Sequence, residues 1–134
     1  MSKFVVLYLI SLIIFLLIDF VWLAFIAKGL YAKSIGHLMA DKVNYVAALV
    51  FYLIFIAGLT HFVTLPALSE GMAARMIFSA AFFGFVTYAT YDLTNLATLK
   101  DWPLKVTLID LVWGMFISTS VSTLTLWVSK FFNC

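Results

Sequence analysis

Residues 4–27, FVVLYLISLIIFLLIDFVWLAFIA, form one continuous apolar run, and this run decides the fold class. A helix rises about 1.5 Å per residue, so about 20 apolar residues cross the roughly 30 Å hydrocarbon core of a bilayer. The run is therefore long enough to be a transmembrane helix. Because its apolar character continues past Asp19 and no small-residue cleavage site ends it, we expect a retained helix and not a removed signal peptide.

The rest of the chain repeats this pattern. Further apolar runs occupy residues 45–64, 76–98 and 104–128. The chain of 134 residues is 66% hydrophobic and 10% charged, with a mean hydropathy of +1.16, whereas about a quarter of the residues in a soluble domain are charged. We therefore predict an all-α membrane protein, with one four-transmembrane-helix up-down bundle as a single domain over residues 1–134.

Loop-forming residues separate the runs. Lys28 and Gly29 follow the first run, and Pro66 is predicted to end the second. Before the fourth run, Asp101 is predicted to be the N-cap of the helix, with Pro103 in its first turn, where a missing backbone N–H is harmless.

The first loop, residues 28–43, carries apolar residues at helical spacing. A short helix lying in the membrane interface would explain this spacing, and an ordinary polar loop remains the alternative. Aromatic residues near the span ends are predicted to form belts at the two membrane surfaces. They are Tyr8, Tyr31, Trp102 and Trp127.

The distribution of basic residues predicts the orientation. Loops one and three carry five lysines, whereas the N-terminus, the second loop and the C-terminus together carry three basic residues. The positive-inside rule therefore favours a multi-pass protein with loops one and three in the cytoplasm and both termini outside.

Three carboxyl groups lie inside the predicted spans, at Asp19, Asp92 and Asp110. Each is roughly 8 to 13 Å from the end of its helix nearest loop one or three, so alternating helix directions place all three at a similar depth. An aspartate at the centre of a span costs about 2.5 to 3.5 kcal/mol, so these groups are expected to face protein and not lipid.

Helical spacing places polar and aromatic side chains next to these carboxyls. The predicted ligand-binding residues are Asp19 with Trp22; Asp92 with Tyr88, Tyr91 and Asn95; and Asp110 with Trp113. The pentapeptides IDFVW, residues 18–22, and IDLVW, residues 109–113, share the pattern I-D-x-V-W. An indole N–H three residues after an aspartate can donate to its carboxyl.

A stripe of small residues runs along the fourth predicted helix below Asp110. Gly114, Ser118 and Ser122 follow at intervals of four residues, a pattern that lets helix backbones approach closely. We expect Asp110 to point at a neighbouring helix, and we predict homo-oligomers that associate along this stripe or another face.

The unneutralised carboxyls leave several functions open. No lysine or arginine lies deep in the predicted hydrocarbon region, although Lys100 and Lys105 could snorkel inward. The carboxyls could share protons, bind a hard cation, or hold a cationic or hydroxylated ligand. Alternatively, each carboxyl simply accepts hydrogen bonds from neighbouring tyrosine, tryptophan or asparagine side chains and joins the helices.

Three classes of function remain as hypotheses. The leading one is binding or transport of a small solute or cation with proton linkage. The others are a membrane-embedded enzyme or accessory subunit acting on lipid, and a structural or lipid-binding protein. Hydrolase elbows, metalloprotease motifs, phosphate loops and nucleic-acid footprints have no match, and no cofactor, catalytic residue or metal ligand is assigned.

Two segments resemble a known family. Residues 89–103 read ATYDLTNLATLKDWP and residues 107–114 read TLIDLVWG. Together with Asp19, Trp22 and Asn44, they resemble a bacterial family of small predicted membrane proteins, domain of unknown function 2177, over nearly the whole chain. The resemblance implies a four-helix inner-membrane protein and carries over no activity.

Overall fold

The computed structural model describes residues 2–70 and 74–132, and within these residues the regular structure is helical. Four helical segments are long and apolar enough to cross a membrane: Lys3–Ile26, Tyr45–Glu70, Ala74–Thr98 and Leu104–Phe132. The predicted four-span, all-α fold is therefore confirmed.

Each span combines one long helix with short helical extensions. The first consists of α1 (Lys3–Val21) and a π-helical turn (Trp22–Ile26), and the second of α3 (Tyr45–Leu59), a π-helical turn (Thr60–Thr64) and α4 (Leu65–Glu70). The third is α5 (Ala74–Thr98), and the fourth is α6 (Leu104–Ser129) followed by a 3₁₀ turn (Lys130–Phe132). Loop one forms α2 (Lys28–Ile35) and a 3₁₀ turn (Gly36–Leu38).

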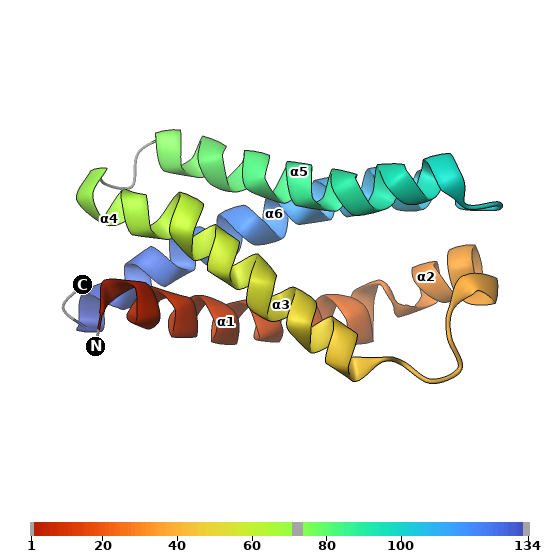
Figure 1. Cartoon of the computed structure of the whole chain (residues 1–134), viewed down its shortest axis with the longest axis horizontal. Coiled ribbons are helices and arrows are strands. Elements are labelled where there is room, and N and C mark those ends of the chain that lie inside the picture. The colour runs from red at the N-terminus through yellow and green to blue at the C-terminus, as the bar shows by residue number, and fades with distance from the viewer. Residues whose placement is uncertain (1, 71–73, 133–134) are drawn as a thin grey trace.

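The helices pack around α6. In Figure 1, α1 and α6 run antiparallel, α5 lies along α6, and α3 crosses the bundle obliquely. In this view α1 begins and α6 ends at one end of the bundle, and α2 lies at the other. The apolar core includes Leu7, Phe15, Phe55, Leu59 and Ile117. Many large apolar side chains on the outside are exposed, as expected where lipid is the solvent.

Pro66 does not end the second span, contrary to the sequence prediction. The helix continues to Glu70, and the backbone N–H of Leu65 bonds to the carbonyl of Thr60, five residues earlier. A proline lacks an N–H and collides with the carbonyl four residues before it. The wider π-helical turn immediately before Pro66 alters this spacing and accommodates the ring.

Asp101 is not the N-cap of the fourth helix, which is a second correction. The N-cap position is occupied by Pro103, and no side chain caps the helix there. Asp101 instead has φ of 66°, in the left-handed region that aspartate tolerates better than most residues. Its backbone therefore makes the tight turn between α5 and α6.

Two glycines let α5 and α6 touch through their backbones. A Cβ atom added to Gly84 would lie 2.0 Å from the carbonyl oxygen of Gly114, and one added to Gly114 would lie 2.6 Å from the ring of Tyr88. Ser118 and Ser122 continue this contact line and are fully buried. The small-residue stripe is therefore used inside the chain, which corrects the prediction that it could join two copies.

Candidate functional site

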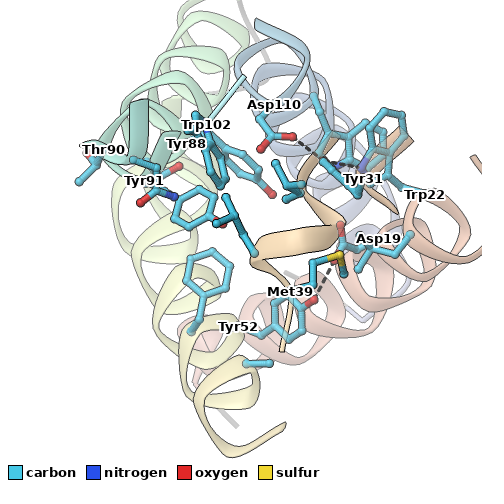
Figure 2. A pocket seen from close by; sticks show the side chains of 18 of the residues that line it. Asp19, Trp22, Tyr31, Met39, Tyr52, Tyr88, Thr90, Tyr91, Trp102 and Asp110 are labelled. Carbon is cyan, nitrogen blue, oxygen red and sulfur yellow. Dashed lines mark hydrogen bonds between the residues drawn. The ribbon is translucent and has the colours of Figure 1, made fainter. Parts of the chain in front are cut away.

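A cavity of about 910 Å³ lies in the half of the bundle that contains loops one and three. Figure 2 shows its walls, which come from all four spans and from α2. Most lining side chains are aromatic or aliphatic, and two carboxyls and an asparagine supply much of the polarity. The lining residues are Asp19, Trp22, Leu23, Tyr31, Ile35, Leu38, Met39, Ala48, Phe51, Tyr52, Thr87, Tyr88, Thr90, Tyr91, Asn95, Leu99, Trp102, Asp110 and Trp113.

Each cavity carboxyl accepts a hydrogen bond from a tyrosine on another element. The Tyr52 hydroxyl on α3 donates to Asp19 Oδ2 over 2.9 Å, and the Tyr31 hydroxyl on α2 donates to Asp110 Oδ1. Figure 2 shows both pairs, with the tyrosines reaching across from α3 and α2. Asp19 and Asp110 are 7% and 6% exposed. Each carboxyl therefore keeps acceptor capacity beyond its tyrosine, since a carboxylate has about four lone-pair sites.

The two I-D-x-V-W segments meet at their tryptophans. The rings of Trp22 and Trp113 stack with centroids 4.2 Å apart and planes 11° from parallel. The Trp22 indole N–H donates over 3.3 Å to the Tyr31 hydroxyl, which in turn binds Asp110. Trp22 is thus linked through Tyr31 to Asp110, the carboxyl of the other segment. This corrects the predicted bond to Asp19, three residues before Trp22 in the same helix.

Trp113, the other ring of the stack, also lies near the carboxyl of the opposite segment. Trp113 lies close enough to Asp19 to interact with it, although its N–H makes no hydrogen bond of standard geometry. Because α1 and α6 are antiparallel (Figure 1), the tryptophan of each I-D-x-V-W segment lies on the side of the aspartate of the other segment. The repeated pentapeptide therefore forms a paired, inverted arrangement around the stack.

Asp92 lies behind the cavity wall and does not line the cavity. It is 0% exposed, and neither carboxyl oxygen has a hydrogen-bond partner of standard geometry. Its nearest titratable neighbour is the carboxyl of Asp110, which lies on α6 one helical turn after Thr107. Its backbone carbonyl accepts a hydrogen bond of 3.5 Å from Thr107, whose hydroxyl accepts from Trp102 over 3.0 Å.

The structure brings seven of the eight predicted site residues to the cavity, and Asp92 is the exception. Sequence reasoning missed Tyr31 and Tyr52 as carboxyl partners. Tyr31 and Trp102 were predicted as belt residues, but both line the cavity. The helical spacing of loop one was the available signal for Tyr31, because it indicated an element with one apolar side that could fold over the bundle.

The hydroxyl of Tyr31 remains a hydrogen-bond donor in this position. Burial and the adjacent Asp110 carboxyl raise the pKa of Tyr31 above its ordinary value. The Tyr31 phenol therefore keeps its proton at neutral pH, and its hydrogen bond attaches α2 to α6.

The cavity has no basic side chain among its lining residues. In the part of the chain that the structure describes, the one ion pair joins Arg75 to Glu70 over 3.7 Å, and its second-loop position places it at the opposite end of the bundle. Residues 2–70 and 74–132 also contain no group of three or more His, Cys, Asp or Glu side chains that could hold a metal ion. The three aspartates therefore do not form one shared cation cage.

Two of the side chains that line the cavity are largely exposed. Phe51 on α3 and Tyr91 on α5 both line the cavity, and they are 47% and 56% exposed. The first half of α3 buries no side chain, since the buried residues of this helix begin at Phe55. The part of the cavity wall formed by α3 and α5 therefore includes side chains that are largely exposed.

Replacing Tyr31 with phenylalanine is expected to loosen α2. A hydrogen bond to a charged group contributes about 1.5 to 3 kcal/mol, so the amides of residues 28–38 should exchange about tenfold faster or more. Hydrogen exchange measured by mass spectrometry checks this, with Tyr45→Phe as the matched control because Tyr45 is exposed. Equal exchange in the two variants would show that the Tyr31 bond does not hold α2.

Comparison with known proteins identifies the family. The family model described as "Predicted membrane protein (DUF2177)" matches residues 4–127. The chain belongs to this family, as its sequence resemblance implied. Neither the search of curated proteins nor the search of solved structures found a significant match.

Proposed function

We propose that this member of the DUF2177 family of predicted membrane proteins binds lipophilic organic cations in its carboxylate cavity. One observation carries the proposal. Two nearly buried carboxyls, Asp19 and Asp110, lie in a cavity that has a largely aromatic wall and no basic lining residue. This refines the hypothesis of a small solute or cation, with Asp19, Trp22, Tyr88, Tyr91, Asn95, Asp110 and Trp113 as the residues around the ligand.

Electrostatics favours a positively charged ligand. A buried carboxylate that lacks a counter-charge has lost its hydration without compensation, and this costs several kcal/mol. A tyrosine hydroxyl offsets part of this cost at Asp19 and at Asp110. A cation about 4 Å from one carboxylate would gain about 4 kcal/mol at an effective dielectric constant of 20, before its own desolvation is counted.

The aromatic wall favours an organic cation over a metal ion. Cations bind the faces of tryptophan and tyrosine rings within about 6 Å, with the strongest effect where water is excluded. Tyr88, Tyr91 and Trp102 line the cavity together with the stacked pair Trp22 and Trp113. An inorganic ion prefers a cage of oxygen ligands, whereas apolar substituents on an organic cation would fill the apolar volume.

The exposed wall between α3 and α5 supports uptake from the membrane. Phe51 and Tyr91 belong both to the cavity and to the exposed surface, so a ligand dissolved in the bilayer could reach the carboxyls without first crossing loop one. The proposed setting is the bacterial inner membrane, as the family resemblance implies. The excess of lysines in loops one and three favours placing these loops in the cytoplasm.

Tetraphenylphosphonium and tetraphenylborate test the proposal, because they share size and shape and carry opposite charges. Equilibrium dialysis of the protein in a neutral detergent, with protein-free micelles as reference, measures the binding of each ion. We expect the cation to bind with at least about tenfold higher affinity, which corresponds to about 1.4 kcal/mol. Equal binding of the two ions, or stronger binding of the borate, would overturn the proposal.

A further inference from the structure

Asp92 is a buried acid that does not line the cavity in which the cation is proposed to bind. It is 0% exposed, it lies outside the cavity lining, and its oxygens have no hydrogen-bond partner of standard geometry. Its position is fixed by α5 and by the bond from Thr107 to its backbone carbonyl. An ionised carboxylate in such a place would be expensive as long as no water, donor or neighbouring positive charge compensates for its charge.

The titratable groups around Asp92 are all acidic or phenolic. Asp110 lies beside it on α6, and the hydroxyls of Tyr31 on α2 and Tyr91 on α5 are close enough to interact with it electrostatically. Lys100 and Lys105, on either side of the α5–α6 turn, are exposed, and among the described residues neither forms an ion pair. The immediate neighbour of Asp92 is thus a second carboxyl.

The hydrogen-bond direction at Asp110 distinguishes the two carboxyls. Asp110 accepts from the Tyr31 hydroxyl, and a hydrogen-bond donor stabilises the charged form of a carboxyl, so the shared proton is assigned to Asp92. A neutral Asp92 supplies an O–H donor for Asp110, and two adjacent carboxyls that share one proton avoid the repulsion of two negative charges. One proton on Asp92 thus explains how its carboxyl can be fully buried and how it can lie next to the carboxyl of Asp110.

We propose that Asp92 holds a proton that the protein exchanges for the bound organic cation, an inference that rests on the proposed function. In the empty site, the neutral Asp92 carboxyl donates to the Asp110 carboxylate. When a cation binds beside Asp110, the Asp92 O–H bond breaks, the electron pair stays on the Asp92 oxygen, and the proton leaves through Asp110 into the cavity and to water. One positive charge enters and one leaves, so the net charge of the site is unchanged.

The exchange has a definite dependence on pH. Because cation binding releases a proton, a rise in pH favours the bound state, and a fall in pH favours the empty, protonated state. Where one full proton is released, the affinity increases tenfold for each unit of pH. Asp92 thereby becomes the residue that links ligand binding to the proton concentration.

Proton release on binding tests the exchange. Tetraphenylphosphonium is added to saturation to the protein in neutral detergent and weak buffer, and a pH-indicator dye reports the protons released. We expect about one proton per bound cation in the wild type and in Asp41→Asn, a control that removes an exposed carboxyl outside the cavity. Asp92→Asn should bind the cation and release none. Wild-type binding without proton release, or unchanged release from Asp92→Asn, would overturn the proposal.

Infrared spectroscopy of the ligand-free protein separates this inference from the proposed function. A protonated-carboxyl absorption should be present at neutral pH, shift in Asp92→Glu and vanish in Asp92→Asn. If the cation does not bind, the proposed function and the exchange both fail, while this band still shows whether Asp92 carries a proton. A band that is absent from the wild type would contradict the proton on Asp92 even where the cation binds, and the wild-type measurement does not depend on the folding of any variant.

Discussion

Gly84→Ala is expected to destabilise the bundle by about 3 kcal/mol or more, at the upper end of the cost of overpacking a core. The added methyl group would lie 2.0 Å from the carbonyl oxygen of Gly114 and 2.5 Å from the hydroxyl oxygen of Ser118. Because one of these atoms belongs to a helix backbone, α5 and α6 must separate to make room. Separation would disturb the wall of the cavity, since Tyr88 and Asp110 project from these two helices.

Gly29→Ala is the matched control for this effect. An alanine Cβ at Gly29 would meet no atom within 4 Å, and alanine is favoured over glycine in helices by up to about 1 kcal/mol. Thermal unfolding followed by circular dichroism in detergent should therefore show a large loss for Gly84→Ala and no loss for Gly29→Ala. Equal stability of the two variants would mean that α5 and α6 do not touch at Gly84.

Replacing both cavity carboxyls, as Asp19→Asn with Asp110→Asn, is expected to weaken cation binding about 100-fold. Each carboxylate attracts the cation, but desolvation offsets most of the Coulomb energy, which leaves a net contribution of about 1.4 kcal/mol per group, or tenfold in affinity. Because asparagine has nearly the shape of aspartate and can accept a hydrogen bond from Tyr52 or Tyr31, the double variant changes charge more than packing.

The same dialysis assay with tetraphenylphosphonium measures this loss. Asp41→Asn is the charge-matched control and should bind like the wild type, since Asp41 is exposed and lies outside the cavity. The single variants should each lose about tenfold. An unchanged affinity in the double variant would show that the cation binds elsewhere, for example on the lipid-facing surface.

The sequence predicted the four spans because span length and hydropathy are local properties. Each predicted run matches a helical span of the structure to within a few residues, apart from the continuation through Pro66 to Glu70. That continuation depends on a π-helical turn, which sequence patterns do not specify. The turn at Asp101 was missed for a related reason. An aspartate shortly before a helix can be its N-cap or a left-handed loop residue, and the sequence does not distinguish the two.

The site was partly predictable, because carboxyls within spans must find polar surroundings in the protein. Depth and helical spacing grouped three carboxyls with aromatic neighbours, and the structure brings Asp19 and Asp110, but not Asp92, to one cavity with an aromatic lining. The partners were different from those expected, because Tyr31 and Tyr52 reach the carboxyls from other helices. Spacing within one helix says nothing about contacts between helices, and the same limit explains the unexpected pairing of Trp22 with Tyr31.

A structure of the protein soaked with tetraphenylarsonium tests the cation site most directly, because the anomalous scattering of arsenic locates the ligand without ambiguity. We expect one arsenic peak inside the cavity, beside the carboxyls of Asp19 and Asp110 and next to the stacked rings of Trp22 and Trp113. A peak confined to the outer, lipid-facing surface, or an empty cavity at a saturating concentration, would contradict the proposed cation-binding function.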